Sequence, residues 1–279
     1  MKSIKLNDGN IIPQLGYGTY QTPNGDIAIL SVKQAIEIGY THIDTAAVYG
    51  NEVSVGEGIK RSGIDRADLF ITSKVWNRER GYDRTIKAFE KTLSDLGTDY
   101  LDLYLIHWPA NAMQFPNWKE LNLDTWRALE YLKKEGRIKS IGVSNFMINH
   151  LEPLLAEAEI QPAVNQIEFH PGFMQSEVVE YCQSRGIVIE GWSPLGVGKL
   201  IGNKVLAGVA KNHNKSTAQV ALRWSLQHNV IPLPKSVTPS RMKDNLDVFD
   251  FELSDTEMRL INEIPHMAFS GLDPNSVTF

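Results

Sequence analysis

Two kinds of segment alternate along the whole chain. Short β-branched or leucine-rich runs, such as Leu103–Trp108 and Val188–Trp192, look continuously apolar, which is typical of parallel strands that are covered on both faces. Between these runs lie stretches whose apolar residues recur with the period of a helix. One such helical face consists of Ile86, Phe89, Leu93 and Leu96. This alternation predicts an α/β protein with a parallel sheet.

Eight strand–helix units follow one another without a break in composition. The predicted strands end near Gly18, Asp44, Lys74, His107, Ser144, Gln166, Trp192 and Pro234. Successive ends are 22 to 42 residues apart, and one strand plus a crossover helix needs about 30 residues. We therefore expect one (β/α)8 TIM barrel domain over residues 1–279, a fold that typically takes about 250 residues. An open doubly wound sheet is the alternative, because periodicity does not decide closure.

Further segments flank the eight units. Ile4–Pro13 has turn-forming residues between apolar flanks and predicts an N-terminal β-hairpin over one end of the barrel. Two more helices are expected near Pro239–Val248 and Ser254–Ile264, followed by the tail Phe269–Phe279.

Composition narrows the classes of partner and compartment. A net charge of −5 and a pI near 5.8 argue against nucleic acid or an anionic membrane as the main partner. No apolar run approaches the ~20 residues of a membrane-spanning helix. Cys182, the only cysteine, lies in a helix-like stretch and is expected to be a buried, unreactive thiol. These features favour a reducing, cytoplasmic compartment.

Four groups that could do chemistry lie at the carboxyl ends of adjacent strands. Asp44, Lys74 and His107 end the second, third and fourth strands, and Tyr49 follows Asp44 by five residues. Each alone has a structural explanation, as a helix cap, a solvated lysine or a core histidine. Together they predict a reactive site at the barrel mouth.

The four side chains suit general acid catalysis. A phenol is a poor acid at neutral pH, with a pKa near 10, and we expect the ammonium of Lys74 to lower the pKa of Tyr49. Asp44 would keep Lys74 charged and in place, and His107 would orient a carbonyl substrate. A metal site is not expected, because the histidines lack metal-ligand spacing, and His170 is expected to be structural.

Glycine and basic residues suggest where a phosphate could bind. Gly16–Gln21 begins like a dinucleotide fingerprint but lacks its third glycine, so we reject that interpretation. Gly196–Lys199 is expected to be a flexible loop. The better phosphate site is Leu233–Ser236 with Arg241 at the opening of a helix, although a solvated basic turn is the plain alternative.

The chain resembles the aldo-keto reductases along essentially its whole length, and most closely the small prokaryotic and protozoan members similar to 2,5-diketo-gluconate reductases. The segments that carry the resemblance are His42–Glu52, Ile71–Trp76, Asp102–Pro109, Ile141–Phe146, Val164–Pro171, Gly191–Gly196 and Leu233–Ser236. They occur in the order of the family and fall on the predicted strands.

The resemblance implies a catalytic tetrad of Asp44, Tyr49, Lys74 and His107, and NADPH lying across the barrel mouth. Cofactor contacts are implied for Ser144, Asn145 and Gln166 at the nicotinamide carboxamide, Trp192 stacked on its ring, Ser193, Leu195 and Gly198 at the pyrophosphate, Lys235, Ser236 and Arg241 at the 2′-phosphate, and Asp244 and Asn245 at the adenine. Many relatives have Tyr in place of Trp192 and Glu in place of Asp244, so these two contacts differ in detail.

The implied activity is reduction of small carbonyls such as methylglyoxal, aliphatic and aromatic aldehydes and keto-sugars, by a monomer. Tyr20, Trp76 and Trp108 would line the substrate pocket beside His107, although ordinary core packing is the alternative for each. The tail Phe269–Phe279 would close over the substrate. Two rival functions remain: a lyase with Lys74 as Schiff-base amine, and a non-catalytic NADP(H)-sensing subunit on the same fold.

Overall fold

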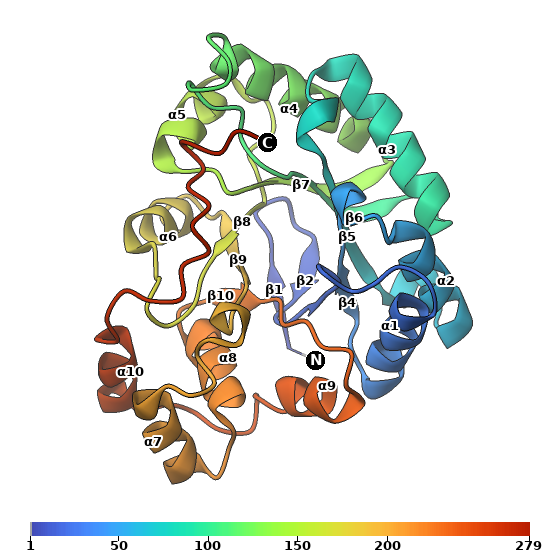
Figure 1. Ribbon diagram of the computed structural model, residues 1–279. Coiled ribbons are helices and arrows are strands. Elements are labelled where there is room, and N and C mark those ends of the chain that lie inside the picture. Colours follow the sequence, from blue (N-terminus) through green and yellow to red (C-terminus); the bar gives the residue numbers. More distant parts are fainter. Residues whose placement is uncertain (1) are drawn as a thin grey trace.

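A barrel of eight parallel strands surrounded by helices forms the body of the computed structural model, which describes residues 2–279 (Figure 1). Met1 of the expected domain lies outside the described residues. The strands pair in chain order and are β3 (Tyr17–Gly18), β4 (His42–Asp44), β5 (Phe70–Val75), β6 (Leu101–Ile106), β7 (Ile138–Ser144), β8 (Val164–Glu168), β9 (Val188–Trp192) and β10 (Val230–Pro232). The predicted (β/α)8 fold is confirmed, and each strand ends within two residues of its predicted end.

Backbone hydrogen bonds join the first barrel strand to the chain at the end of the last one. Gly16 N donates to Pro232 O at 3.2 Å, and Gly18 N donates to Pro234 O at 3.1 Å. A Cβ atom on Gly16 would lie only 2.5 Å from Leu233 Cδ2, so glycine is needed for the two segments to approach. The barrel is therefore closed, and the glycines of Gly16–Gly18 belong to its seam rather than to a nucleotide-binding turn.

Helices cover the outside of the barrel. They are α1 (Asp26–Ile38), α2 (Glu52–Ser62), α3 (Tyr82–Leu96), α4 (Trp118–Lys134), α5 (Ile148–Glu157), α6 (Ser176–Gln183), α7 (Lys204–His213), α8 (Thr217–Gln227), α9 (Pro239–Leu246) and α10 (Asp255–Asn262), with short 3-10 turns η1 (Ala47–Tyr49), η2 (Arg66–Asp68), η3 (Asn77–Glu79) and η4 (Gly196–Gly198). The long interval between β9 and β10 holds two helices, α7 and α8, where the sequence suggested one crossover.

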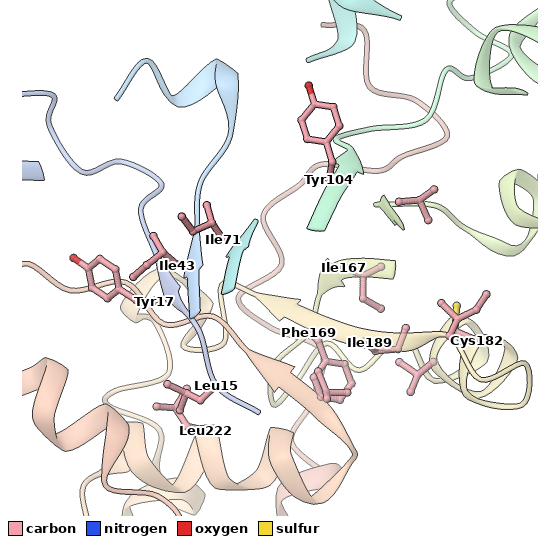
Figure 2. Packing of buried hydrophobic residues seen from close by; sticks show 14 of the residues in the cluster. Leu15, Tyr17, Ile43, Ile71, Tyr104, Ile167, Phe169, Cys182, Ile189 and Leu222 are labelled. Atoms are coloured by element: carbon pink, nitrogen blue, oxygen red, sulfur yellow. The ribbon is translucent and has the colours of Figure 1, made fainter. Parts of the chain in front are cut away.

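Strand alternation divides the apolar side chains into two cores, because successive residues of a strand point to opposite faces. One face packs on the helices: Figure 2 shows Ile43, Ile71, Ile167 and Ile189 in this outer core, together with Leu222 of α8. A smaller, separate cluster fills the inside of the barrel. Its members from the strands are Phe70, Leu103, Leu105, Val164 and Ile231.

The N-terminal hairpin closes one end of the barrel, as predicted. Its strands β1 (Ser3–Lys5) and β2 (Ile11–Pro13) are antiparallel, with Ile4 opposite Ile12. Leu6 and Ile12 are buried in the inner cluster, and burying a side chain of this size stabilises a fold by about 1.5–3 kcal/mol. The hairpin meets the amino-terminal parts of the strands, which leaves the carboxyl ends open as the mouth.

Candidate active site

Asp44 and Lys74 form a buried ion pair at the top of the barrel interior. Asp44 is the last residue of β4, and Lys74 lies on the adjacent strand β5. Lys74 Nζ is 2.8 Å from each carboxylate oxygen of Asp44 and donates to Thr45 O at 2.8 Å. Lys74 is fully buried. Burial disfavours the ammonium, but the charge of Asp44 and the bonds to it outweigh this effect and raise the pKa of Lys74.

Tyr49 is brought to this ion pair by a short turn. Residues Ala47–Tyr49 form the 3-10 turn η1, which ends at Gly50 in the left-handed conformation. The hydroxyl of Tyr49 lies 3.4 Å from Lys74 Nζ. Burial raises the pKa of Tyr49 to about 12, and the nearby Lys74 opposes this effect without overcoming it. The expectation that Lys74 would give a net lowering is therefore wrong for the protein alone, because loss of hydration is the larger effect.

His107 completes the group from the next strand. It directly follows β6, and its ring contacts the ring of Tyr49 edge-on, with centroids 5.7 Å apart. Burial and the charge of Lys74 hold the pKa of His107 well below its usual value, so the imidazole is neutral. Among residues 2–279, nothing hydrogen-bonds to its buried Nδ1. The four residues predicted from adjacent strand ends thus lie together.

Aromatic side chains surround the space beside Tyr49 and His107. The ring of Tyr20 lies 5.0 Å from that of Tyr49, and the ring of Trp76 lies 5.3 Å from that of His107. Phe279 stacks on Trp76 with centroids 5.6 Å apart and contacts Trp108 edge-on. Tyr20 is exposed and Trp108 is buried, so the walls differ in how far they reach into solvent.

The C-terminal tail reaches these aromatic side chains from α10, passing α6 and α5 (Figure 1). Its first anchor is Ser270, whose backbone N and hydroxyl both donate to the buried carboxylate of Glu168, at 3.0 and 2.7 Å. The second anchor is at Val277, whose carbonyl oxygen accepts a hydrogen bond from Asn111 Nδ2 at 2.8 Å. Asn77 then donates to Phe279 O at 3.0 Å. The tail is therefore fastened across one side of the mouth.

Gln166 joins the ion pair from the opposite side of the barrel. Its Nε2 donates to Asp44 Oδ2 and to Glu190 Oε2, both at 2.9 Å. Both amide hydrogens are thereby used, and the carbonyl oxygen Oε1 is the atom left to meet a ligand. Glu190 is fully buried, and burial next to Asp44 raises the pKa of Glu190 to about 8.

Ser144, Asn145 and Trp192 are bonded mainly to the protein. Asn145 has a left-handed backbone, with φ of 63°, and its Nδ2 donates to His107 O at 3.0 Å. Its Oδ1 accepts from Trp192 Nε1 at 2.8 Å. Ser144 Oγ donates to Gln166 O at 2.8 Å. These bonds fix His107, Gln166 and Trp192 relative to one another.

A loop of unusual backbone geometry follows β9. Ser193, Gly196, Val197 and Gly198 all have positive φ, and the last three form η4 with Leu195 before it. A Cβ atom on Gly196 would lie 2.6 Å from Ala268 Cβ, so only glycine lets the loop pack against the tail. This loop was expected to be flexible, and it is a series of tight turns beside the mouth.

The predicted phosphate site lies at the start of α9. Lys235 and Arg241 are exposed, and among residues 2–279 no carboxylate forms an ion pair with either. Ser236 accepts from Thr238 N at 3.1 Å, and its own carbonyl accepts from Tyr17 OH at 2.6 Å. Lys235 Nζ donates only to the carbonyl oxygen of Gln21, at 3.3 Å, and two cations without an ion pair beside a hydroxyl and a helix start suit a phosphate monoester. Asp244 is exposed on α9, and Asn245 is buried behind it.

Sequence reasoning missed Glu190 and Arg80. Arg80 is buried and donates to Trp108 O and Pro109 O, at 3.1 and 2.9 Å, which supports the loop that carries Trp108. Glu190 stands in the run Val188–Trp192, which we interpreted as continuously apolar. The signal was available, because a carboxylate within a strand that is buried on both faces needs partners.

The expectations for Cys182 and His170 agree with the structure. Cys182 is buried in α6, and burial raises the pKa of its thiol to about 11. His170 is buried, with Nδ1 2.9 Å from Pro171 O. Within residues 2–279 there is no cluster of three metal-ligating side chains, and none of the helices there is both long and apolar enough to cross a bilayer.

Comparison with known proteins gives matches over almost the full length. The sequence model of the Aldo/keto reductase family matches residues 14–265. The chain is 52% identical over 277 residues to glyoxal reductase of Bacillus subtilis, covering 99% of this chain and 98% of that protein. It is 41% identical over 274 residues to methylglyoxal reductase DkgA of Escherichia coli, covering 98% and 96%. A crystal structure of a Gox0644 mutant in complex with NADPH has a TM-score of 0.92 and 41% identity, covering 100% of this chain and 99% of that one.

Proposed function

The chain belongs to the aldo/keto reductase family, and on that basis we propose that it reduces small aldehydes and ketones to alcohols with NADPH. The observation that carries the proposal is the contact of the Tyr49 hydroxyl with Lys74 Nζ at 3.4 Å, among the aromatic rings of Tyr20, His107 and Trp76. An acidic hydroxyl among aromatic rings that carry no permanent charge suits an uncharged carbonyl compound.

Tyr49 acts as the general acid. A phenol is protonated at neutral pH even at its ordinary pKa, and burial raises the pKa of Tyr49 further, so the proton is present but is released only with assistance. As the proton leaves, the ammonium of Lys74 stabilises the phenolate that forms. Asp44 contributes indirectly, because its two bonds to Lys74 Nζ keep the ammonium charged and aimed at Tyr49.

His107 orients the substrate. A neutral imidazole carries one N–H and can donate a hydrogen bond to a carbonyl oxygen. The rings of Tyr49 and Trp76 on either side fix the plane of the imidazole. The carbonyl oxygen is thereby placed near the Tyr49 hydroxyl, where it receives the proton.

NADPH, when bound, supplies the hydride for the reduction. Lys235, Ser236 and Arg241 hold its 2′-phosphate, which explains why two cations at the α9 rim are left without ion pairs. Asn245 and Asp244 would contact the adenine, and Ser193, Leu195 and Gly198 would line the pyrophosphate. Gln166 Oε1, Ser144 and Asn145 would hold the carboxamide of nicotinamide, with Trp192 beside the ring.

The substrate range follows from the pocket and from the relatives. Tyr20, Trp76 and Trp108 would line the substrate site beside His107, and the ring of Phe279 packs against Trp76 and Trp108, which favours small carbonyls. Relatives named glyoxal reductase and methylglyoxal reductase support dicarbonyls as the first compounds to test, and simple aldehydes and keto-sugars follow in the same panel. We also propose a monomer in a reducing, cytoplasmic compartment, where Cys182 stays a thiol.

A spectrophotometric assay of NADPH oxidation against a panel of carbonyls tests the proposal. Tyr49→Phe should lower kcat by about 10²–10⁴-fold, the usual contribution of a general acid, while NADPH binding, followed by quenching of tryptophan fluorescence, stays nearly unchanged. Turnover by the variant at the parental rate would exclude Tyr49 as the acid. Tight NADPH binding without turnover of any carbonyl would favour a cofactor-sensing subunit instead.

A further inference from the structure

A chain of hydrogen bonds runs from the proposed acid into the barrel interior and ends at a buried carboxyl group that has no part in the proposed chemistry. Lys74 Nζ donates to Asp44, and Gln166 Nε2 donates both to Asp44 and to Glu190. Glu190 lies on β9 directly opposite Gln166 of β8 in the parallel register. The structure therefore places two carboxyl groups around one amide nitrogen.

This arrangement decides which way the amide of Gln166 faces. With Nε2 between Asp44 and Glu190, both of its hydrogens are bonded at 2.9 Å. If the amide were reversed, its oxygen would lie against the carboxylate of Asp44, which is paired with the ammonium of Lys74, and against Glu190. The contact with Asp44 would then join two acceptor atoms, so the amide oxygen is directed away from the interior.

Within residues 2–279, the carboxyl group of Glu190 forms no hydrogen bond other than the one to Gln166. Its Oε1 lies 3.6 Å from His42 Nε2, which is too long for a hydrogen bond, and no atom of residues 2–279 bonds to that oxygen. His42 bonds instead to Thr72 Oγ1 at 3.1 Å. Burying a carboxyl group costs free energy unless it is bonded, so the bond to Gln166 is the contact that accounts for Glu190 at this position.

We propose that Glu190 is a positioning residue, which holds the amide of Gln166 with its NH2 inward and its oxygen presented to the carboxamide of nicotinamide. This inference rests on the proposed function and adds to it a determinant of how the nicotinamide ring is oriented. Glu190 acts through Gln166 and touches neither substrate nor cofactor. Without it, one amide hydrogen of Gln166 is left unbonded in the interior, and the amide can turn.

The first test compares two ligands of the same site. Glu190→Leu should bind NADPH roughly tenfold more weakly, the ratio expected for one hydrogen bond. The same variant should bind adenosine 2′,5′-bisphosphate, which lacks nicotinamide, as the parent does. Glu190→Gln keeps an acceptor oxygen and should restore NADPH affinity. Dissociation constants of both ligands would be measured by tryptophan fluorescence or calorimetry.

A second buried glutamate provides the matched control. Glu52 accepts from Ser73 Oγ at 2.6 Å and from Thr92 Oγ1 at 3.3 Å, and burial raises the pKa of Glu52 to about 7. The partners of Glu52 lie on β5 and α3, and neither is Gln166. Glu52→Leu should therefore lower the melting temperature without changing the ratio of the two dissociation constants. Should Glu190→Leu fail to fold, Glu190→Thr keeps a polar group that is too short to reach Gln166.

The second test follows the orientation of the ring directly. With NADPH deuterated on one face or the other of the nicotinamide ring, the parent protein should transfer deuterium from one face alone. Glu190→Leu should transfer a measurable fraction from the opposite face, and Glu190→Gln should not. Mass spectrometry of the alcohol product gives this fraction independently of the rate.

The outcomes separate the inference from the function on which it rests. Equal weakening of both ligands in Glu190→Leu, or no weakening of NADPH, would overturn the positioning role even in an active reductase. Strict transfer from one face in that variant would overturn it as well. If no carbonyl compound of the panel supported NADPH oxidation by the parent protein, the proposed function would fail. The ratio of the two dissociation constants could still be measured in that case.

Discussion

At the inner end of the candidate site, Lys74, Asp44, Gln166 and Glu190 are buried and bonded to one another, whereas Lys235 and Arg241 at the α9 rim are exposed and have no ion-pair partners among residues 2–279. The inner groups are fixed by strands before any ligand arrives, whereas the rim groups are left without an opposite charge until a ligand binds. Charge at the inner end therefore affects folding and chemistry together, and charge at the rim affects binding alone. Four predictions test this difference.

The largest effect is expected from breaking the inner ion pair. Lys74→Met leaves Asp44 buried without its cation, which typically costs 3–5 kcal/mol of folding free energy, and it removes the charge that stabilises the Tyr49 phenolate. We expect a large fall in the free energy of unfolding, measured in urea, and nearly complete loss of carbonyl reduction.

The double variant Asp44→Asn, Lys74→Met should recover stability but not activity, since no uncompensated charge remains. Lys91 forms an exposed pair with Asp95 at 2.7 Å, and Lys91→Met provides the control, with an expected cost below about 1 kcal/mol. Equal losses for Lys74→Met and Lys91→Met would contradict the difference between buried and exposed charge.

The second largest effect is expected at the rim. Lys235→Ala with Arg241→Ala removes two charge-assisted bonds, each worth about 1.5–3 kcal/mol, so the Kd of NADPH should rise by 10²-fold or more. The Kd of NADH, which lacks the 2′-phosphate, should change little, and the melting temperature of the ligand-free protein should stay the same. Parallel losses for NADPH and NADH would remove the assignment of these residues to the 2′-phosphate.

The third prediction concerns the pH dependence of stability. Burial raises the pKa of Glu190 to about 8 in the folded protein, whereas the unfolded chain releases this proton near the ordinary value of 4.5. The stability that Glu190 contributes is present below pH 4.5 and is lost as the pH rises towards 8. The free energy of unfolding of Glu190→Gln minus that of the parent should therefore increase between pH 5 and pH 8, by at most about 1.4 kcal/mol per pH unit.

Urea unfolding at several pH values checks this slope. Asp244→Asn at the exposed rim is the control for removal of a surface carboxyl group, measured over the same pH range. A flat difference for Glu190→Gln would mean that the folded protein does not retain the proton.

The smallest effect is expected from salt. Exposed charges are screened beyond a Debye length of about 8 Å at physiological ionic strength, so the Kd of NADPH should rise several-fold between low and high salt. The difference in the free energy of unfolding between the parent and Lys74→Met should not change with salt, because the Lys74–Asp44 pair is buried. Salt-independent NADPH binding would argue against Lys235 and Arg241 as its contacts.

Much of the fold was predictable from local patterns. Apolar runs gave strands that end within two residues of the observed ends, and turn residues gave the hairpin at Ile4–Pro13. The grouping of Asp44, Tyr49, Lys74 and His107 followed from a general rule, since parallel strands bring their carboxyl ends to one side of a barrel. The second helix between β9 and β10 was missed because the length of an interval does not show how many helices fill it.

Other features depend on contacts between segments far apart in the chain. The net pKa of Tyr49 was mispredicted, because the sequence identifies a neighbouring lysine but not how much water the fold removes. The role of Gly16 was visible only once Leu233 was seen against it. Glu190 was overlooked because a run of apolar neighbours hides a single carboxylate until its partner on another strand is known.

The sequence by itself determined the period of strands and helices and the kinds of group at the strand ends, since these depend on neighbours along the chain. Tertiary structure decided the closure of the barrel, the direction of the Gln166 amide and the protonation of the buried groups. These three properties depend on distance and hydration between strands, and both are set only when segments more than a hundred residues apart, such as Asp44 and Gln166, come into contact.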